Sequence, residues 1–179
     1  MNLQQIGLKY ETDKAFFHKY LDFYEKHLPK PSFKGRLLEI GVMDGASLRM
    51  WREYYPKAEI IGVDIDSKSH LEIDHVVILQ LDATQPEQLK DLGYFDIIVD
   101  DGSHMTKDQQ ASFEWLYYNQ LNKGGIYVLE DLHTSLMPSY VNSDLTTLEY
   151  LKKSKLKVEY YRRDPDVADS MTCVIKAGQ

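Results

Sequence analysis

Two short segments place acidic pairs beside histidines, a combination that could hold a metal ion and move a proton. The first reads DDGSH over residues 100–104, and the second reads LEDLHTS over residues 129–135. Hard divalent cations such as Mg²⁺ take oxygen ligands, often a few carboxylates with positions left open for water or substrate. The sequence therefore predicts a divalent-metal site whose ligands are Asp101, Glu130 and Asp131.

His104, three residues beyond Asp101, is the candidate general base. Imidazole titrates near neutrality, and a hydroxyl bound to a metal ion loses its proton more easily. His133 is a candidate acceptor-binding residue, only because it lies close to the second acidic pair. Each segment by itself could equally be a turn or a helix cap, but two uncompensated acidic pairs at one place would repel each other. The joint pattern therefore favours a functional site.

A glycine-containing turn, EIGVMDGASL over residues 39–48, indicates where a cofactor would bind. Gly41 and Gly45 permit a tight turn and let a ligand approach the backbone at the start of a helix. Asp64 ends the next apolar run, where a carboxylate can accept both hydroxyls of a ribose. Together these features predict a cofactor that contains adenosine.

The charge of this region selects among the adenosine cofactors. A nicotinamide dinucleotide would favour the fuller G-x-G-x-x-G pattern, and Asp44 lies where a pyrophosphate would be repelled. Acidic groups suit a cationic sulfonium and ammonium, so S-adenosylmethionine is the expected cofactor. Glu39, Asp82 and Asp100 join the predicted cofactor set, with Asp82 as the acceptor for the adenine amine.

These residues need a scaffold that collects them at one edge, and the order of elements supplies it. Short β-branched runs alternate with helical segments, which predicts a parallel sheet covered by helices on both faces. The expected strands are RLLEIG (36–41), EIIGVD (59–64), VVILQL (76–81), FDIIVD (95–100) and GGIYVLE (124–130), and the expected helices are SLRMWREYY (47–55) and KDQQASFEWLYYNQL (107–121). The continuous hydrophobicity of IIGV, VVIL and DIIV predicts central strands. Ligands bind beyond the carboxyl ends of such strands, where the candidate acids fall.

The C-terminal region predicts an antiparallel pair at one edge of this sheet. KLKVEYY (155–161) and MTCVIK (171–176) are separated by a turn-rich stretch that contains Pro165. The expected fold class is α/β, a Rossmann-like three-layer sandwich with a mostly parallel sheet. We expect a single domain over residues 1–179, with an N-terminal helical segment (1–34) and a Rossmann-like core (35–179).

The N-terminal segment is expected to hold one amphipathic helix within residues 12–29. Thr12 or Asp13 would cap its first turn by accepting free backbone N–H groups. Pro29 and Pro31 would stop it, because the residue before a proline avoids the helical conformation.

Bulk composition excludes several classes of protein. The chain has 179 residues, is 43% hydrophobic and carries a net charge of −7, which argues against a nucleic-acid partner. Its apolar stretches are short and its N-terminus lacks a signal-peptide pattern, so we expect no membrane partner and a cytoplasmic location. The single Cys173 fits a reducing compartment and a buried core thiol.

Over these motifs the chain resembles class I S-adenosylmethionine-dependent methyltransferases, typified by the macrocin and mycinamicin sugar O-methyltransferases. EIGVMDGASLRMW, IIGVDID, FDIIVDDGSH and GGIYVLEDLHTS carry the resemblance, and the N-terminal YETDKAFFHKY is similar to the family's Y-x-T-D-K segment. The resemblance implies a seven-stranded sheet, bound S-adenosylmethionine, a divalent metal usually taken to be Mg²⁺, and a sugar hydroxyl as acceptor. The residues that match functional positions are Asp101, Glu130 and Asp131 for the metal, His104 for the base, and Gly41, Asp64 and Asp82 for the cofactor pocket.

The resemblance also implies a role for the N-terminal segment. Thr12, Lys14 and His18 fall where this segment can approach the methionine end of the cofactor or the acceptor. The antibiotic-tailoring relatives are longer and enclose a macrolide with extra segments, so the identity of the acceptor does not follow. Acceptor specificity is expected to lie in residues 137–153, which have the polarity of a mobile loop.

The function expected from the sequence is metal-assisted O-methylation of a sugar or another small hydroxylated metabolite. One alternative is an NAD(P)-dependent oxidoreductase on the same sheet, which the acidic glycine turn disfavours. The other is a non-catalytic methyltransferase-like binding module. A degenerate site has no reason to keep an acidic rim that costs stability through repulsion, which argues against the second alternative. The sequence leaves homo-oligomerisation open.

Overall fold

The computed structural model describes residues 1–164 and 170–178, and over these residues it shows a seven-stranded sheet. The strand order is β3-β2-β1-β4-β5-β7-β6. The strands are β1 (Arg36–Ile40), β2 (Glu59–Asp64), β3 (Val76–Gln80), β4 (Phe95–Asp100), β5 (Leu121–Leu129), β6 (Val158–Arg162) and β7 (Met171–Lys176). Strands β1 to β5 run parallel, and β7 is antiparallel to both β5 and β6. The predicted parallel sheet with an antiparallel edge pair is confirmed, although Pro165 lies outside the described residues.

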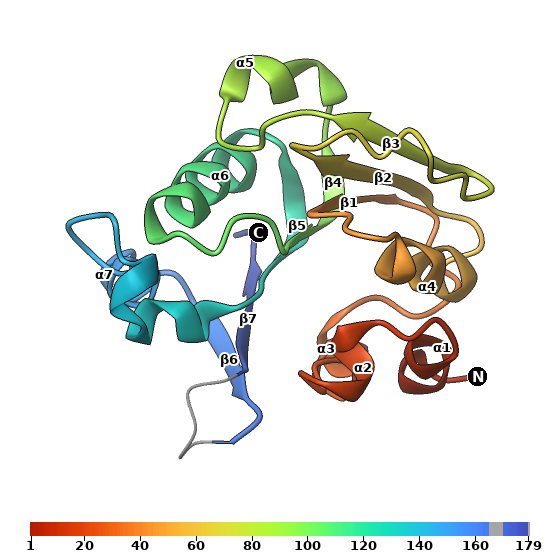
Figure 1. Cartoon of the computed structure of the whole chain (residues 1–179), viewed down its shortest axis with the longest axis horizontal. Helices are drawn as coiled ribbons and strands as arrows, with labels where there is room; N and C mark the ends of the chain where they lie inside the picture. Colours follow the sequence, from red (N-terminus) through yellow and green to blue (C-terminus); the bar gives the residue numbers. More distant parts are fainter. Residues whose placement is uncertain (165–169, 179) are drawn as a thin grey trace.

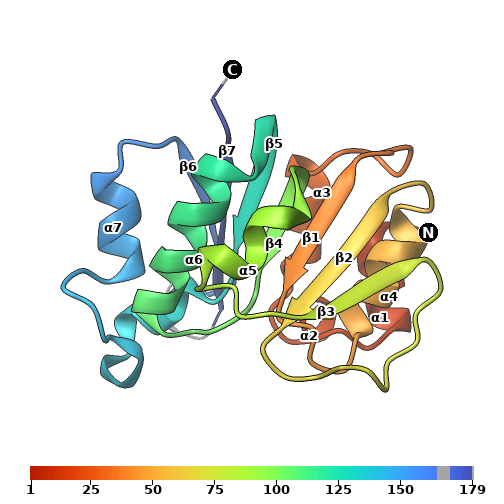
Figure 2. The ribbon, with the colours of Figure 1, turned by 90° about the horizontal axis from the view of Figure 1, so that it is seen from above.

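Helices cover both faces of the sheet, so the predicted three-layer architecture is also confirmed (Figures 1 and 2). One layer contains α1 (Leu3–Lys9), α2 (Asp13–Phe16), α3 (Leu21–His27) and α4 (Ala46–Tyr54), and the other contains α5 (Pro86–Leu89), α6 (Thr106–Asn119) and α7 (Thr147–Lys153), with short 3-10 turns at η1 (Lys90–Leu92), η2 (Leu132–Leu136) and η3 (Pro138–Tyr140). Each layer closes its own apolar core against the sheet. Across the described residues, no helix has both the length and the apolar character needed to cross a membrane.

The prediction that VVIL forms a central strand is wrong. It belongs to β3, which lies at the edge of the sheet and pairs only with β2 among the described strands. Val77 is 50% exposed, whereas Ile61 in the neighbouring β2 is buried. A run of apolar residues does not encode how many neighbours a strand has, because an edge strand covered by loops needs apolar side chains as well.

The single helix expected within residues 12–29 is also wrong, because the structure breaks it into α2 and α3. Lys19 lies between them with φ of +57°, a left-handed conformation that no helix can contain. The Thr12 side chain makes no capping hydrogen bond. Asp13 is the first residue of α2, and its carboxylate accepts a hydrogen bond from the neighbouring N–H of Lys14 at 2.8 Å. The break directs polar side chains of this segment toward the carboxyl edge of the sheet.

The segment expected to govern acceptor specificity, residues 137–153, is only partly a loop. It contains η3 and α7, and α7 begins with a capping box at Thr146 and Glu149. Leu151 is buried, and the hydroxyl of Thr147 donates to the side-chain oxygen of Gln109 in α6 at 2.8 Å. The second half of this segment is therefore anchored to the helical layer beside β5.

Candidate active site

The turn after β1 lies directly against the turn after β4, and Gly41 makes this contact. A Cβ atom built on Gly41 would lie 2.0 Å from the backbone oxygen of Asp101. Gly41 also has φ of +86°, in the region that favours glycine. Its N–H donates to the carbonyl of Val63 at the end of β2, at 2.8 Å. One glycine therefore brings the ends of three neighbouring strands together.

Two pockets meet at Gly41. The first has a volume of about 400 Å³ and extends over β2 and β3, with Asp64, Asp82 and Ser103 among the lining residues. The second has a volume of about 240 Å³ and lies between the β1 turn and the N-terminal segment, where Thr12 contributes to its wall. Gly41 lines both pockets, so an elongated ligand could extend across the edge of the sheet from one to the other.

The first pocket presents carboxylate acceptors at the ends of strands. Asp64 accepts from the N–H groups of Val42 at 2.9 Å and Asp66 at 2.9 Å. Burial raises the pKa of Asp64, but these backbone donors outweigh it and hold the pKa below its usual value. Asp82 accepts from both the hydroxyl and the N–H of Thr84, at 2.7 and 2.9 Å.

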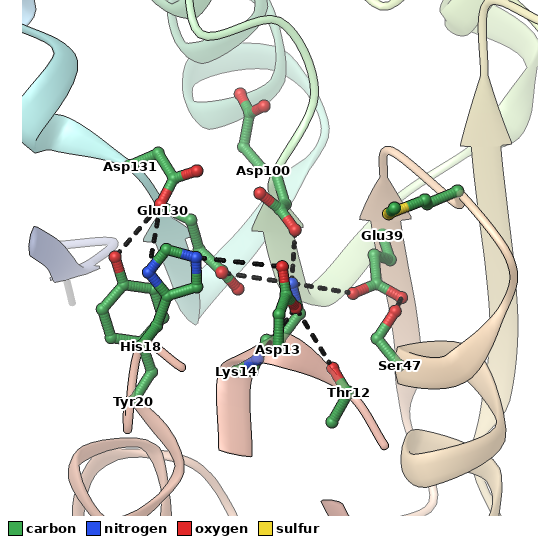
Figure 3. Close-up of polar contacts among 12 residues, drawn as sticks. Thr12, Asp13, Lys14, His18, Tyr20, Glu39, Ser47, Asp100, Glu130 and Asp131 are labelled. Atoms are coloured by element: carbon green, nitrogen blue, oxygen red, sulfur yellow. Dashed lines mark hydrogen bonds and ion pairs between the residues drawn. The ribbon is translucent and has the colours of Figure 1, made fainter. Parts of the chain in front are cut away.

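Lys14 lines the second pocket. Its ammonium lies among three carboxylates (Figure 3). Its ammonium donates to Asp101 and, at 3.1 Å, to Oε2 of Glu130, and it lies 3.8 Å from Oε1 of Glu39. The side chain of Lys14 is 1% exposed. Burial alone would lower its pKa, but Asp101, Glu130 and Glu39 together raise the pKa of Lys14 well above its usual value. The ammonium is therefore charged.

Asp101, His104 and Asp131 form a cluster suited to a divalent cation. One ligand atom from each residue lies within 4.8 Å of the others. Nδ1 of His104 is 3.5 Å from Oδ2 of Asp131. The backbone of Asp131 has φ of +52°. Two carboxylate oxygens and an imidazole nitrogen are an appropriate partial set for a divalent metal that keeps open positions.

Glu130, which the sequence grouped with the metal acids, is oriented differently. It is 2% exposed, and its Oε2 is bonded to Lys14. Its Oε1 is buried and accepts no hydrogen bond from any described residue. Buried carboxylate oxygens are normally satisfied, so this atom marks a place where a cation or a donor fits. The structure thus brings Asp101 and Asp131 together with His104, and it places Glu130 beside them, against Lys14.

An aromatic and imidazole group surrounds Asp131. The hydroxyl of Tyr20 donates to Oδ1 of Asp131 at 3.1 Å, and the His18 ring stacks on Tyr20 with centroids 4.9 Å apart. Nδ1 of His133 lies 3.8 Å from the same Oδ1 and has no hydrogen-bond partner within the described part of the chain. Sequence reasoning did not single out Tyr20, because its spacing is that of an ordinary core residue of an amphipathic helix.

Three residues assigned to the cofactor from the sequence line neither pocket. Glu39 lies below the β1 turn, where it accepts from the Ser47 hydroxyl at 2.9 Å. Asp100 accepts from the hydroxyls of Ser112 and Tyr127, both at 2.6 Å, on the α6 side of the sheet. Gly45 has φ of +81° and precedes α4. These three residues lie next to the turns after β1 and β4, and other residues of those turns line the pockets.

No family model matches the chain, but curated proteins and solved structures resemble it. It is 36% identical over 169 residues to the 8-demethyl-8-alpha-L-rhamnosyl tetracenomycin-C 2'-O-methyltransferase of Streptomyces olivaceus, covering 84% of this chain and 44% of that protein. It is 34% identical over 170 residues to the demethylmacrocin O-methyltransferase of Streptomyces fradiae, covering 84% of this chain and 43% of that protein. The chain spans less than half the length of these two relatives.

A solved structure of the MycE methyltransferase from the mycinamycin biosynthetic pathway, in complex with Mg and SAH, superposes on the whole chain. The TM-score is 0.85 and the sequence identity is 28%, with 100% of this chain and 55% of that chain covered. The sheet and helical layers of the present chain therefore have the Rossmann-like methyltransferase fold.

Proposed function

The homologues of this chain are sugar O-methyltransferases of the tetracenomycin and macrocin type, and from this relationship we propose that it is itself an S-adenosylmethionine-dependent O-methyltransferase domain. The observation that supports this best is the position of Asp101. It lines the second pocket and also belongs to the cluster with His104 and Asp131. A cofactor in the pockets and a cation at the cluster would therefore be neighbours.

The pockets fit the two ends of the cofactor. The carboxylates of Asp64 and Asp82 would accept from the ribose hydroxyls and the adenine amine in the first pocket. Thr12 and Lys14 would bind the amino-acid end in the second pocket, with Lys14 as the cationic partner of its carboxylate. When bound, the cofactor supplies an electrophilic methyl group on a sulfonium. The protein's task is then to orient the acceptor and to remove its proton.

Asp101 and Asp131 would hold the divalent cation, which we propose to be Mg²⁺, with the unpaired oxygen of Glu130 close by. The cation would lower the pKa of a coordinated sugar hydroxyl. His104 would accept the proton: Asp131 lies beside its Nδ1, which favours the tautomer that leaves Nε2 as the acceptor atom. The His104 side chain is 40% exposed, so an acceptor can reach it.

The acceptor we propose is a neutral small molecule that carries a sugar hydroxyl. The rim is acidic, and an anionic acceptor would be repelled by Asp101 and Asp131 unless the metal offset their charge. His18 and His133 lie around Asp131, with their Nδ1 atoms 3.9 and 3.8 Å from its Oδ1, and we place the acceptor's neighbouring hydroxyls on this side of the cluster.

Isothermal titration with S-adenosylhomocysteine, with and without Mg²⁺, tests the cofactor assignment, and NAD is the matched control. Micromolar binding of S-adenosylhomocysteine and none of NAD supports the proposal. Transfer of a labelled methyl group from S-adenosylmethionine to a rhamnoside would then test the acceptor class. Preference for NAD, or absence of binding to both ligands, would contradict the proposed function.

A further inference from the structure

Lys14 connects the second pocket to the cluster of Asp101, His104 and Asp131. Its ammonium carries three N–H donors, and the described residues supply hydrogen-bond acceptors in two groups, Asp101 and Glu130. Both are carboxylates of the metal-site region. The same side chain lines the second pocket, on the side where the N-terminal segment closes it.

Asp101 is shared in the same way. One of its oxygens accepts from Lys14, and the residue also contributes a ligand atom to the cluster with His104 and Asp131. A cation at the cluster would attract Asp101, and an anion in the second pocket would attract Lys14. Both ligands would therefore act on the same Lys14–Asp101 ion pair. The pair is shielded from water, since the side chains of Lys14 and Asp101 are 1% and 20% exposed. Electrostatic coupling is stronger there than at the surface.

We infer that Lys14, beyond pairing with the cofactor's carboxylate, couples occupation of the metal site to occupation of the cofactor pocket. This inference rests on the proposed function. A divalent cation at the cluster competes with Lys14 for the negative charge of Asp101, so one N–H of the ammonium can turn to an anion in the pocket while another keeps its bond to Glu130. An anion in the pocket conversely offsets the repulsion between the ammonium and the cation. Each ligand therefore strengthens the binding of the other.

Titration of S-adenosylhomocysteine with and without Mg²⁺ measures this coupling as a ratio of dissociation constants. For the wild-type chain we expect a ratio within the range of about 5- to 150-fold that is common for coupled sites. In Lys14→Met the ratio should fall to about 1. Lys9→Met is the matched control, because Lys9 is an exposed lysine that pairs with Glu53 and should leave the ratio unchanged.

A ligand control needs no substitution at all. 5′-Methylthioadenosine keeps the adenosine and lacks the amino-acid carboxylate, so Mg²⁺ should leave its affinity for the wild-type chain unchanged. The reverse titration, of Mg²⁺ with and without S-adenosylhomocysteine, must return the same coupling ratio, because linkage is reciprocal. If Mg²⁺ raises the affinity for 5′-methylthioadenosine as much as the affinity for S-adenosylhomocysteine, Lys14 does not couple the two sites.

Removing Lys14 alone leaves the buried carboxylates of Glu39 and Glu130, and the partly buried Asp101, uncompensated and could unfold the chain. The double variant Lys14→Met with Glu39→Gln removes one charge of each sign, and its folding is checked by circular dichroism. Should it bind both ligands with wild-type coupling, the inference is overturned while the proposed function stands. If the wild-type chain binds Mg²⁺ and S-adenosylhomocysteine independently, the inference is likewise wrong. If it binds no S-adenosylhomocysteine under either condition, the proposed function fails and the inference fails with it.

Discussion

Tyr20 donates a hydrogen bond of 3.1 Å to Oδ1 of Asp131, joining the N-terminal segment to the end of β5 across 111 residues of chain. The second oxygen of Asp131 faces His104 at 3.5 Å. Asp131 also adopts φ of +52°, which is uncommon outside glycine. The phenol thus fixes a carboxylate that the backbone presents in a strained conformation. It orients one group of the metal cluster without belonging to that cluster.

Tyr20→Phe should therefore weaken the metal site more than the fold. Loss of a partner that orients a metal ligand commonly costs about 10- to 100-fold in metal affinity. The loss of one buried hydrogen bond should lower the free energy of unfolding by about 1 kcal/mol. Tyr55→Phe is the control, because that buried phenol bonds to the carbonyl of Pro29 instead. Calorimetric titration with Mg²⁺ and urea unfolding measure both quantities, and equal metal affinities in the two variants would contradict the role of Tyr20.

His104→Gln should lower methyl transfer to a rhamnoside by about 10²- to 10⁴-fold, as expected for loss of a general base. Binding of S-adenosylhomocysteine should stay unchanged, because His104 lines neither pocket. His75→Gln is the control, because His75 is exposed and its replacement should leave methyl transfer unchanged. Mg²⁺ affinity separates two roles of His104: an unchanged affinity fits a base, and a large loss would make this residue a metal ligand instead.

Gly41→Ala should abolish cofactor binding and destabilise the fold. The new Cβ would meet the backbone oxygen of Asp101 at 2.0 Å, in addition to the cost of φ at +86°. Gly124→Ala isolates the second effect, since Gly124 has φ of +79° with no atom within 4 Å of the added carbon. We expect about 1–2 kcal/mol of lost stability at Gly124 and clearly more at Gly41. Similar unfolding curves for the two variants would show that the contact between the turns is not tight.

The stability of the chain should depend on pH through Glu39. Burial raises the pKa of Glu39 to about 7, against the lowering effect of Lys14. A carboxyl whose pKa is higher in the folded than in the unfolded state contributes stability that is fully present below its usual pKa of 4.5 and is lost as pH rises through about 7. The free energy of unfolding of the wild-type chain, relative to Glu39→Gln, should therefore fall by about 3 kcal/mol between these pH values. Parallel pH profiles would show that the pKa of Glu39 is not raised.

Much of the scaffold follows from local patterns. Short β-branched runs marked β1, β2 and β4, and the alternation with helical segments placed them in a parallel sheet. Because parallel strands end at one edge, the acids that follow them had to meet there. The edge position of β3 did not follow, since burial of a strand depends on neighbours that its own residues do not specify.

Neighbouring acids show where local information ends. Asp100 and Asp101 are adjacent in sequence, yet Asp100 bonds to Ser112 and Tyr127 below the rim while Asp101 reaches the metal cluster. Successive side chains of a strand point to opposite faces, so one residue of such a pair must turn away. Which one turns away depends on the position at which β4 ends, and that is decided by its pairing with β1 and β5.

The sequence by itself determined the mostly parallel sheet, the presence of acids at its carboxyl edge and the tight glycine turn after the first strand. These depend on period, residue size and backbone freedom, all of which are local. Only the tertiary structure decided that Lys14 and Tyr20 reach those acids. Their partners lie 87 to 116 residues away, and the helix that local spacing favours is broken at Lys19. The hydrogen bonds and charge pairs gained across the chain outweigh the turn of helix that is lost, and no local pattern records such a gain.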